Sequence, residues 1–346
     1  MDILLEEAVE RFLAERCDPG RVREIEADGS GGAADALWAE LSETGFADAL
    51  VAEHLGGSGL ALADAAAIAF ACGRHAVPVP LSLTMSVRAA LSGSGSPPPP
   101  GSITVADSVD TVNDGTLAAK AVPYGAVADW VLLPLDSGSV LLPGKAARRI
   151  GRGGHGCQAA DLSWPAPGAH DAIRLPESDG ERVEWTAIAA ALVAGQIAGA
   201  MERVVEMTIE YAKVRSQFGQ PIGKRQAIQQ QISVMVEQSF AGRSAALVAL
   251  SGRSWRVDAF RAGVAKSRAG EAAAFVAAGA HAVHGAIGLT EEYDLQILTR
   301  RLHEWRAAYG GQQYWNRRLG QELLDGTFAP LEFLRRRLAA TDGAHD

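Results

Sequence analysis

Four consecutive prolines interrupt the chain within GSGSPPPPGS, at residues 93–102. Proline has no backbone N–H and fixes φ near the polyproline II value, so this run cannot be helical. It predicts a domain boundary or an exposed loop. Residues 1–95 alternate Ala- and Leu-rich stretches with glycine turns, a pattern that predicts an N-terminal helical domain.

Two further changes of pattern follow the prolines. Residues 96–180 contain short segments rich in Val, Leu and Ile, among them SITVADSV, TLAAKAVPYG, ADWVLLPL, SVLLPG and DAIRLP. Their lengths and the Gly, Asp, Pro and Ser clusters between them predict a small β domain of five or more strands. Residues 181–346 return to long helical runs with apolar residues at helical spacing, which predicts a bundle.

The order helical, β, helical excludes a doubly wound sheet, which needs alternating strands and helices. The GRGGHG stretch at residues 151–156 has neither the spacing of a dinucleotide-binding turn nor a helix after it. A loop between two strands is the better interpretation of this stretch.

Charge and cysteine usage narrow the class of protein. The formal net charge is −9, which favours neither nucleic acid nor an anionic membrane surface as a partner. Cys17, Cys72 and Cys157 are far apart and show no Cys-x-x-Cys spacing, as expected in a reducing cytosol. The N-terminal MDILLEEAVERFLAERC predicts an amphipathic helix and no signal peptide. No uninterrupted apolar run reaches the roughly 18 residues of a membrane span, so we expect a cytoplasmic protein.

A helical run stops abruptly within VRSQFGQPIGKRQAIQQQ, at residues 214–231. Arg215 is placed at the end of one helix, Gly219 and Pro221 close a turn, and a Gln-rich helix begins afterwards. An isolated Arg-x-Gln-Phe-Gly stretch would predict a turn with a solvated arginine. The residues around it favour a more specific interpretation.

The segment YAKVRSQFGQPIGKRQAIQ resembles the Tyr-Ala-x-x-Arg-x-(Gln/Thr)-Phe-Gly-x-Pro-Ile motif of the acyl-CoA dehydrogenase family, which a Gln follows at the start of the next helix. Three other stretches resemble this family in the expected order: VAEHLGGSGL (51–60), KAVPYGAVADWVLLPL (120–135) and HAVHGAIGLTEEYDLQILTRR (281–301). The resemblance implies an α+β multidomain fold. Its parts are an N-terminal helical domain (1–95), a middle β-barrel domain (96–180) and a C-terminal four-helix bundle (181–346).

The resemblance also implies a chemistry. The family oxidises an acyl-CoA thioester to its 2,3-enoyl form: a base removes the proton next to the thioester carbonyl while a hydride leaves the β-carbon for FAD. Electron-transfer flavoprotein is the electron acceptor that the family implies. The resemblance assigns FAD contacts, largely to a flavin bound by a neighbouring subunit, to Arg215, Gln217, Phe218, Gln226 and Gly285. Arginine suits phosphate oxygens because its planar fork is always charged.

The family base is missing from its expected position. Most members carry a Glu in a Tyr-Glu-Gly-Thr run, and the matching stretch here is AAYGGQQ, with Gly310 at the Glu position. A minority place the Glu on an earlier helix, at a position that aligns near Trp255. Asp258 is the only carboxylate nearby, and an exposed structural Asp is the competing interpretation of it.

Several flavin-binding features of the family are also absent. The Thr-Glu-Pro-x-x-Gly-Ser-Asp loop is replaced by SITVADSVDTVNDG, and the Lys-x-Trp contact by the stretch from Lys120 to Tyr124, without the Trp. Ala282, Ala286 and Gln312 replace a Gln, a Gly and a Thr. What a subunit needs for its own flavin and base is lost, whereas what serves a neighbour's flavin remains.

This pattern resembles the shorter, non-catalytic subunit of heteromeric actinobacterial acyl-CoA dehydrogenases, α2β2 tetramers that act on CoA thioesters of steroid side chains. It implies a longer homologous partner that carries the base. Two alternatives stay open: a self-sufficient flavoenzyme that uses Asp258 or Glu304 as base, and a flavin-free assembly scaffold. The spacing of His281, His284 and His303 suits no metal site, so core or surface histidines are expected there.

Overall fold

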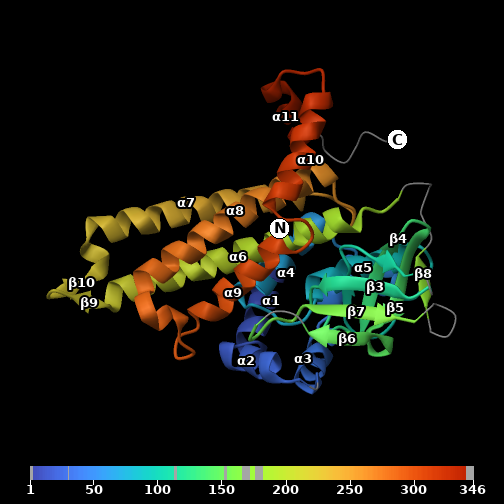
Figure 1. The fold of residues 1–346 in the computed structure, drawn as a ribbon, viewed down its shortest axis with the longest axis horizontal. Helices are drawn as coiled ribbons and strands as arrows, with labels where there is room; N and C mark the ends of the chain where they lie inside the picture. Colours follow the sequence, from blue (N-terminus) through green and yellow to red (C-terminus); the bar gives the residue numbers. More distant parts are fainter. Residues whose placement is uncertain are drawn as a thin grey trace. The chain divides into compact units, whose positions relative to one another are not determined.

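The computed structural model describes residues 3–29, 31–112, 115–151, 154–165, 172–175 and 182–339. The chain forms two compact units, which are described separately (Figure 1). The first comprises Met1–Ile68, Val77–Ala189 and Gly252–Arg256, and the second comprises Ala69–Ala76, Ala190–Ser251 and Val257–Asp346. The division into three domains at residues 95 and 180 stays a prediction.

The chain before the prolines is helical. Its elements are α1 (Ile3–Arg16), α2 (Pro19–Ala27), α3 (Gly32–Ser42), the 3₁₀ turns η1 (Phe46–Asp48) and η2 (Glu53–Leu55), α4 (Leu62–Arg74) and α5 (Leu81–Gly93). Helix α2 shows how the local sequence sets a boundary: Asp18 accepts a hydrogen bond from the Arg21 N–H at 2.8 Å, and Pro19 opens the first turn. Both are favoured helix-start signals.

The proline run links α5 to the first strand and lies outside every helix, as predicted. Helix α5 and strand β1 (Ile103–Val105) are joined by the Thr84 hydroxyl, which accepts from the Ile103 N–H at 2.8 Å and shares its proton between the carbonyls of Ile103 at 3.1 Å and Pro80 at 2.8 Å. Both groups are buried. This pair of hydrogen bonds ties the N-terminal helices to the β region within the first unit.

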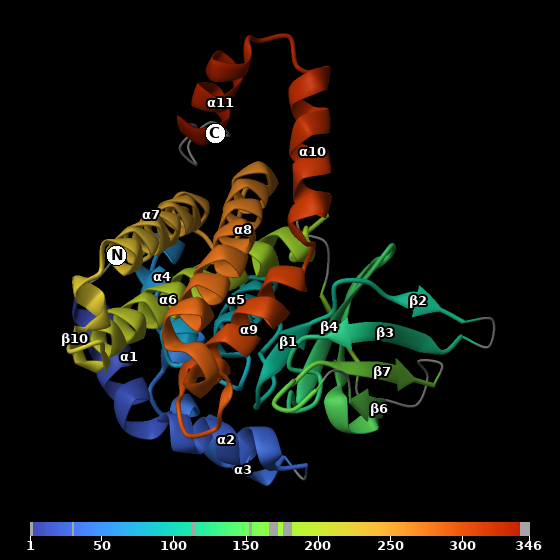
Figure 2. The same cartoon turned by 60° about the vertical axis from the view of Figure 1, so that its left-hand side comes forward.

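The middle segment consists of two four-stranded sheets. One has the order β1-β4-β5-β8 and the other β2-β3-β7-β6 (strands labelled across Figures 1 and 2), and all ladders are antiparallel except β1–β4. The remaining bounds are β2 (Asp110–Thr111), β3 (Leu117–Val122), β4 (Trp130–Leu135), β5 (Gly138–Pro143), η3 (Gly144–Ala146), β6 (Arg148–Gly151), β7 (Ala160–Trp164) and β8 (Ile173–Leu175).

One apolar core serves both sheets. Val131 and Leu142 from the first sheet are buried in the same cluster as Val122, Leu162 and Trp164 from the second. Five or more strands are confirmed. Within the GRGGHG and DAIRLP stretches, residues 152–153, 171 and 176 lie outside the described residues, as do 113–114 of the stretch that replaces the flavin loop.

The C-terminal region is helical, which confirms the predicted fold class. Its elements are α6 (Trp185–Val214), β9 (Ser216–Gln217), β10 (Gln220–Pro221), η4 (Ile222–Lys224), α7 (Gln226–Ala249), α8 (Ala259–His284), η5 (Gly285–Leu289), α9 (Leu295–Ala307), α10 (Gln312–Asp325) and α11 (Pro330–Ala339). Small residues allow close helix packing: a Cβ on Gly73 would lie 1.8 Å from the Gln196 carbonyl oxygen, and one on Gly199 would lie 1.9 Å from that of Phe70.

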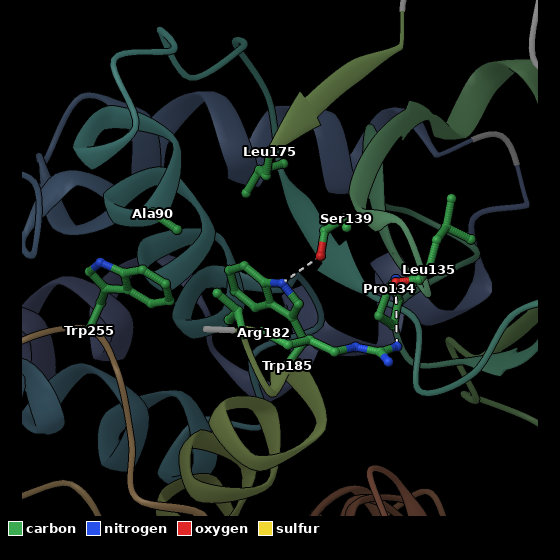
Figure 3. Close-up of a pocket in the computed structure, with 10 residues that line it drawn as sticks. Ala90, Pro134, Leu135, Ser139, Leu175, Arg182, Trp185 and Trp255 are labelled. Atoms are coloured by element: carbon green, nitrogen blue, oxygen red, sulfur yellow. Dashed lines mark hydrogen bonds between the residues drawn. The ribbon is translucent and has the colours of Figure 1, made fainter. Parts of the chain in front are cut away.

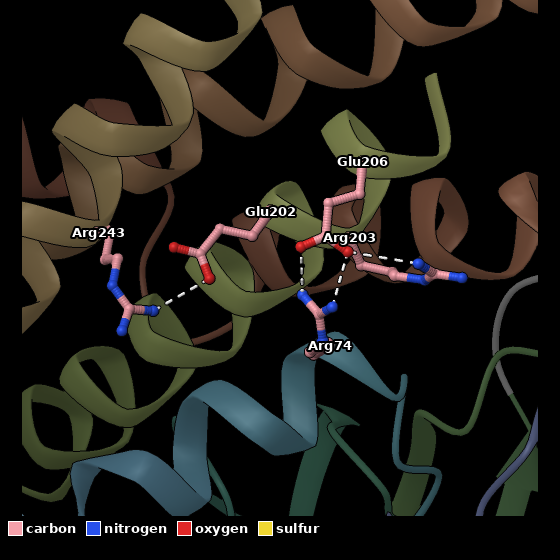
Figure 4. A network of polar contacts seen from close by, with 5 residues as sticks. All are labelled: Arg74, Glu202, Arg203, Glu206 and Arg243. Carbon is pink, nitrogen blue, oxygen red and sulfur yellow. Dashed lines mark hydrogen bonds and ion pairs between the residues drawn. The ribbon is translucent and has the colours of Figure 1, made fainter. Parts of the chain in front are cut away.

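A charged network lies where α4, α6 and α7 meet within the second unit (Figure 4). Arg74 pairs with both carboxylate oxygens of Glu206, at 2.9 and 2.6 Å, and Arg243 pairs with Glu202 at 3.0 Å. Burial raises the pKa of Glu202, against the opposing effect of Arg243. Burial acts the same way on Glu206, but the hydrogen bonds and charges of Arg74 and Arg203 outweigh it and lower its pKa. The network helps to hold these helices together.

Two helical stretches among the described residues, Trp185–Val214 and Ala259–Leu289, are long and apolar enough to cross a membrane by length and composition. The sequence analysis considered only uninterrupted apolar runs and so did not predict these stretches. Isolated Gly and charged residues break such a run but barely lower the mean hydropathy over 18 residues. In the first stretch, 89% of the apolar window is buried inside the protein, as is typical of a core helix.

Candidate functional site

The predicted interruption between α6 and α7 is a tight hairpin. Helix α6 ends at Val214, and β9 and β10 then pair antiparallel, with the Ile222 N–H bonded to the Arg215 carbonyl at 2.8 Å. The two tip residues, Phe218 and Gly219, have φ values of +52° and +78°. Two-residue hairpins favour such left-handed tips. The Phe218 side chain is 89% exposed, so the hairpin presents an aromatic ring to its surroundings.

The base of this hairpin and the end of α8 enclose a pocket of about 450 Å³. The pocket brings together segments that are more than 50 residues apart in the sequence. Its lining residues are Tyr211, Arg215, Gln217, Ile222, Arg225, Ile228, Ala282, Val283, His284, Gly285 and Ala286. Three of the five predicted FAD contacts, Arg215, Gln217 and Gly285, therefore share one cavity. Phe218 and Gln226 are exposed and do not line it.

The lining carries two positive charges and no carboxylate. Arg215 and Arg225 are the charged side chains among the lining residues. Neither forms an ion pair with a carboxylate in the described part of the chain. Two unpaired guanidiniums in one cavity make it suitable for an anion such as phosphate.

His284 contributes a neutral polar group to the same pocket. Its Nδ1 donates to the Ala280 carbonyl at 2.8 Å, so Nε2 carries the lone pair, and this buried atom has no hydrogen-bond partner among the described residues. The ring stacks on Tyr211, with centroids 4.4 Å apart. Burial lowers the pKa of His284, and nearby His281 acts in the same direction against the Ala280 hydrogen bond. The imidazole is thus a neutral acceptor at pH 7.

The sequence interpretation treated His284 as a core or surface histidine and did not consider Arg225. Both line the pocket. The signal for His284 was its position directly before Gly285 in the motif at 281–301. Arg225 directly precedes Gln226, but only the folded hairpin shows that it faces the same cavity as Arg215.

Gly310 lies in a closed turn between α9 and α10. Its φ is +79°, and a Cβ there would lie 2.5 Å from Cδ1 of Tyr314 and 2.8 Å from Nε1 of Trp315. The fully buried Lys266 ammonium donates to the carbonyls of Gly310 and Arg306, both at 3.0 Å. Lys266 thus supports the turn, and any side chain at Gly310, which the sequence resemblance aligns with the family Glu, would have to displace Tyr314 and press on Trp315.

The two fallback carboxylates have structural partners. Asp258 caps α8, accepting from the Arg261 N–H at 2.9 Å, and its other oxygen lies 3.6 Å from the Arg337 guanidinium. Glu304 pairs with the buried Arg301 at 2.9 Å. The structural interpretation of Asp258 therefore agrees with its contacts.

Trp255, at the alternative base position, belongs to the first unit. It stacks on Trp185 with centroids 5.6 Å apart, beside a cavity of about 20 Å³ (Figure 3). The Trp185 indole N–H donates to the Ser139 hydroxyl at 3.0 Å. A cavity of this volume holds about one water molecule, which is too little for a substrate.

His281 and His284, expected to be core or surface histidines, have separate hydrogen-bond partners. His281 contacts the Thr299 hydroxyl at 2.9 Å through Nε2, whereas His284 bonds to the Ala280 carbonyl. In the described part of the chain, no group of three or more His, Cys, Asp or Glu side chains is placed to hold a metal ion.

Comparison with known proteins defines the class. Residues 2–97 match the model of the acyl-CoA dehydrogenase N-terminal domain, and residues 185–323 match that of the acyl-CoA dehydrogenase C-terminal domain. The acyl-CoA dehydrogenase IpdE2 of Mycobacterium tuberculosis is 28% identical over 87% of this chain and 90% of its own length. The chain belongs to the acyl-CoA dehydrogenase family and is an oxidoreductase of that family.

Solved structures share the fold. The ChsE4-ChsE5 complex from Mycobacterium tuberculosis aligns with a TM-score of 0.79 at 24% identity, over 94% of this chain and 97% of the other. The Tcur3481-Tcur3483 steroid ACAD aligns with a TM-score of 0.78 at 23% identity, over 93% and 97%. The similarity thus extends over nearly the whole length of both neighbours.

Proposed function

We propose that this chain is a subunit of an FAD-dependent acyl-CoA dehydrogenase that contributes cross-subunit contacts to FAD, while a longer homologous partner supplies the base. The observation that carries the proposal is the contrast between two positions. Arg215, Gln217 and Gly285 converge on one open pocket, whereas a side chain at Gly310 would collide with Tyr314 and Trp315.

The pocket fits the anionic half of FAD. Two guanidiniums without carboxylate partners suit a diphosphate, and the Gln217 amide adds both donor and acceptor capacity. The nearest acidic groups in sequence, such as Glu210, are not part of the lining. FAD would supply the hydride acceptor when bound, and Arg215 would hold its diphosphate and so orient it.

The proton-removing group is assigned to the partner. Removal of the proton next to a thioester carbonyl needs a carboxylate within hydrogen-bond reach of that proton. The turn at Gly310 offers only backbone groups, and the Gly310 carbonyl already accepts from Lys266. The backbone carbonyl of a glycine cannot act as the base, so this chain orients the cofactor and leaves the chemical step to its partner.

The exposed face of the bundle supports assembly. Phe240 on α7 is 70% exposed and Phe275 on α8 is 45% exposed, and Val236 and Leu247 of α7 are also partly exposed. Exposed apolar side chains that gather in one patch mark protein–protein contacts, and these lie on the two packed helices α7 and α8. We infer an obligate heteromer in which these helices contact another subunit, with the base-carrying homologue as the partner.

The substrate class follows from the relatives. The Tcur3481-Tcur3483 neighbour is named a steroid ACAD, and we propose a CoA thioester of a steroid side chain as substrate. Electron-transfer flavoprotein is the proposed electron acceptor. The three cysteines, Cys17, Cys72 and Cys157, are thiols and form no disulfide, which supports a place in the cytoplasm.

The alternatives differ in flavin content. A self-sufficient enzyme would need Asp258 or Glu304 as base, and both carboxylates have structural partners. A flavin-free scaffold would have no use for two unpaired arginines in one cavity.

The test is to purify the chain alone and together with the neighbouring-gene homologue, then measure bound flavin and turnover of acyl-CoA thioesters. We expect little flavin and no turnover for the chain alone, and both for the complex. A yellow, active protein from this chain alone would establish the self-sufficient enzyme, and a colourless complex would establish the scaffold.

A further inference from the structure

Helices α10 and α11 carry an exposed apolar surface that the proposed function does not use. A short link turns α11 back from the end of α10 (Figure 2). The exposed fractions are 80% for Leu324, 46% for Phe328, 61% for Leu331 and 40% for Leu334. All four residues of this α10–α11 surface lie beyond residue 323, where the match to the acyl-CoA dehydrogenase C-terminal domain ends. The surface therefore lies outside the part of the chain that matches that domain.

Helix α11 is fixed on its inner side. Phe333 is 7% exposed, and its ring centroid lies 5.4 Å from that of Phe260 on α8. Arg337, one turn further along, pairs with Glu322 of α10 at 2.8 Å and lies 3.6 Å from Asp258. These contacts hold α11 in one orientation and leave the leucines of its other side exposed.

Two arginines accompany the exposed leucines. Arg317 lies about two helical turns before Leu324, so both are on the same face of α10. Arg335 directly follows Leu334 on α11. Both arginines are exposed, and neither forms an ion pair with a carboxylate in the described part of the chain. The α10–α11 surface thus combines apolar and cationic side chains in a chain whose formal net charge is −9.

The first turns of α1 have the complementary composition. Ile3 is 70% exposed and Leu4 is 76% exposed, whereas Val9 and Leu13 of the same helix are buried. Glu7, one turn after Ile3, is exposed and has no ion-pair partner among the described residues. Four glutamates against two arginines give α1 a formal charge of −2. This helix therefore presents apolar side chains beside a carboxylate.

A second copy of the chain offers the best match to the α10–α11 surface. Both surfaces are exposed in the single chain, so neither covers the other within it. Two α10–α11 surfaces face to face would bring like charges together, whereas α1 brings the opposite charge. Residues 340–346, Ala-Thr-Asp-Gly-Ala-His-Asp, have no large apolar side chain that could cover the leucines. An anionic lipid surface would repel a chain of this net charge.

We propose that the α10–α11 surface of one copy binds the first turns of α1 of a second copy. The exposed leucines of α11 pack against Ile3 and Leu4, and Arg335 pairs with Glu7. Because the two surfaces differ, the contact is head-to-tail, and copies add until a ring closes. This contact is separate from the FAD pocket and from the faces of α7 and α8 that are assigned to the homologous partner.

The experiment is sedimentation equilibrium of the purified full chain over a range of micromolar concentrations. We expect self-association that Leu334→Asp weakens by roughly 10- to 100-fold, because a leucine is lost from the contact. Ile3→Asp, on the other surface, is expected to have an effect of the same size. Leu55→Asp, at a 48% exposed position in η2 outside both surfaces, is the control and should change association by less than about 2-fold.

Charge reversal tests the pairing itself. Arg335→Glu alone and Glu7→Arg alone should each weaken association by roughly 3- to 10-fold, because each puts like charges together. A chain that carries both changes should associate within about 2-fold of wild type. Lys145→Glu, at an exposed position in η3, is the control for the change in net charge. Failure of the double reversal to restore association would overturn the pairing.

Three other results would overturn the proposal. The first is a chain that stays monomeric at every concentration. The second is association that Phe240→Asp abolishes and Leu334→Asp leaves intact, which would assign the contact to α7. The third is a monomer that sediments with phosphatidylglycerol vesicles unless it carries Leu334→Asp, which would make the surface a lipid-binding one. None of these results bears on the flavin content of the complex, which tests the proposed function separately.

Discussion

Two interhelical turns of the second unit share a backbone conformation but differ in how far their side chains are exposed. The α6–α7 turn and the α9–α10 turn each contain two consecutive left-handed residues, Phe218 and Gly219 in one, Tyr309 and Gly310 in the other. In the first, Phe218 is 89% exposed; in the second, Tyr309 is 1% exposed. The same backbone conformation therefore occurs in an exposed hairpin in one place and in a buried turn in the other.

The cationic side chains near the two turns also differ in their partners. Around the open turn, Arg215 and Arg225 have no carboxylate partner and face a cavity. Beneath the closed turn, Lys266 uses its ammonium for the carbonyls of Arg306 and Gly310. A cation that faces a cavity without a carboxylate partner is suited to an anionic ligand, whereas a cation that satisfies backbone carbonyls has a structural role. The comparison explains why a binding role is assigned to one turn and none to the other.

The largest expected effect is a loss of folding stability when the support of the Gly310 turn is removed. Lys266→Met keeps the aliphatic stem but leaves the part-buried carbonyls of Arg306 and Gly310 without this donor, so we expect the free energy of unfolding to fall by about 3–4 kcal/mol. Lys224→Met, on the exposed side of the open turn, is the control and is expected to stay within about 0.5 kcal/mol of wild type. Chemical denaturation measures both. Equal costs would remove the distinction between the turns.

A matched glycine pair sharpens the comparison. Gly219 and Gly310 have φ values of +78° and +79°, but a Cβ on Gly219 would meet nothing within 4 Å, whereas one on Gly310 would press on Tyr314 and Trp315. Gly219→Ala should cost about 1–2 kcal/mol, for the left-handed backbone alone. Gly310→Ala should cost about 1–3 kcal/mol more, for overpacking. Thermal unfolding of the two variants measures both losses of stability. Equal losses would contradict the crowding of the Gly310 turn.

Introducing the family base should not restore activity. Gly310→Glu adds a carboxylate at the aligned position, but the side chain must displace Tyr314, and a base without a positioned flavin and substrate has nothing to act on. We expect a destabilised chain with no acyl-CoA dehydrogenation when it is assayed alone. Turnover by this single variant would contradict the assignment of the chemical step to the partner.

The smallest expected effect is a pH dependence. Burial lowers the pKa of His284 in the folded state, so below the unfolded-state value of about 6.5 the unfolded chain binds more protons. Its contribution to stability is therefore present above pH 6.5 and is lost as the pH falls toward the folded-state pKa. The slope is at most about 1.4 kcal/mol per pH unit.

His284→Phe is the control for this titration, because His281 and His303, whose pKa values burial also lowers, remain in both proteins. The unfolding free energy of wild type should fall relative to that of His284→Phe from pH 7.5 to pH 5.5. A constant difference would mean that the imidazole is not held neutral.

The order of the helices and strands could be predicted from the sequence. The turn between α6 and α7 was also predicted more fully than the turn at Gly310. Proline and alternation patterns placed the helices and strands, because these depend on local backbone preferences. The motif at 214–231 located Arg215 and Gln217, because the whole hairpin lies within one short stretch. Arg225 and His284 were not predicted as pocket residues, because only the folded chain places both in the lining of one pocket.

The closed turn shows the limit of sequence reasoning. Gly310 was identified as the missing Glu, but the sequence did not show that Lys266, 44 residues away in the chain, supports the turn from beneath. Nor did it show that Asp258 caps α8 through the Arg261 N–H. Such partners depend on which faces of the helices meet, and that is fixed by tertiary packing.

The most direct test of the central claim is flavin retention by the assembled complex of this chain with its longer homologue. With Arg215→Ala, a charge-assisted contact worth about 1.5–3 kcal/mol is lost, so FAD affinity should fall by roughly 10- to 100-fold and excess FAD should rescue flavin content. Arg215→Lys should recover part of the loss, and Lys213→Ala, an exposed cation outside the pocket lining, should retain wild-type flavin. If the Arg215→Ala complex keeps its wild-type flavin content after dilution, the cross-subunit role of Arg215 is contradicted.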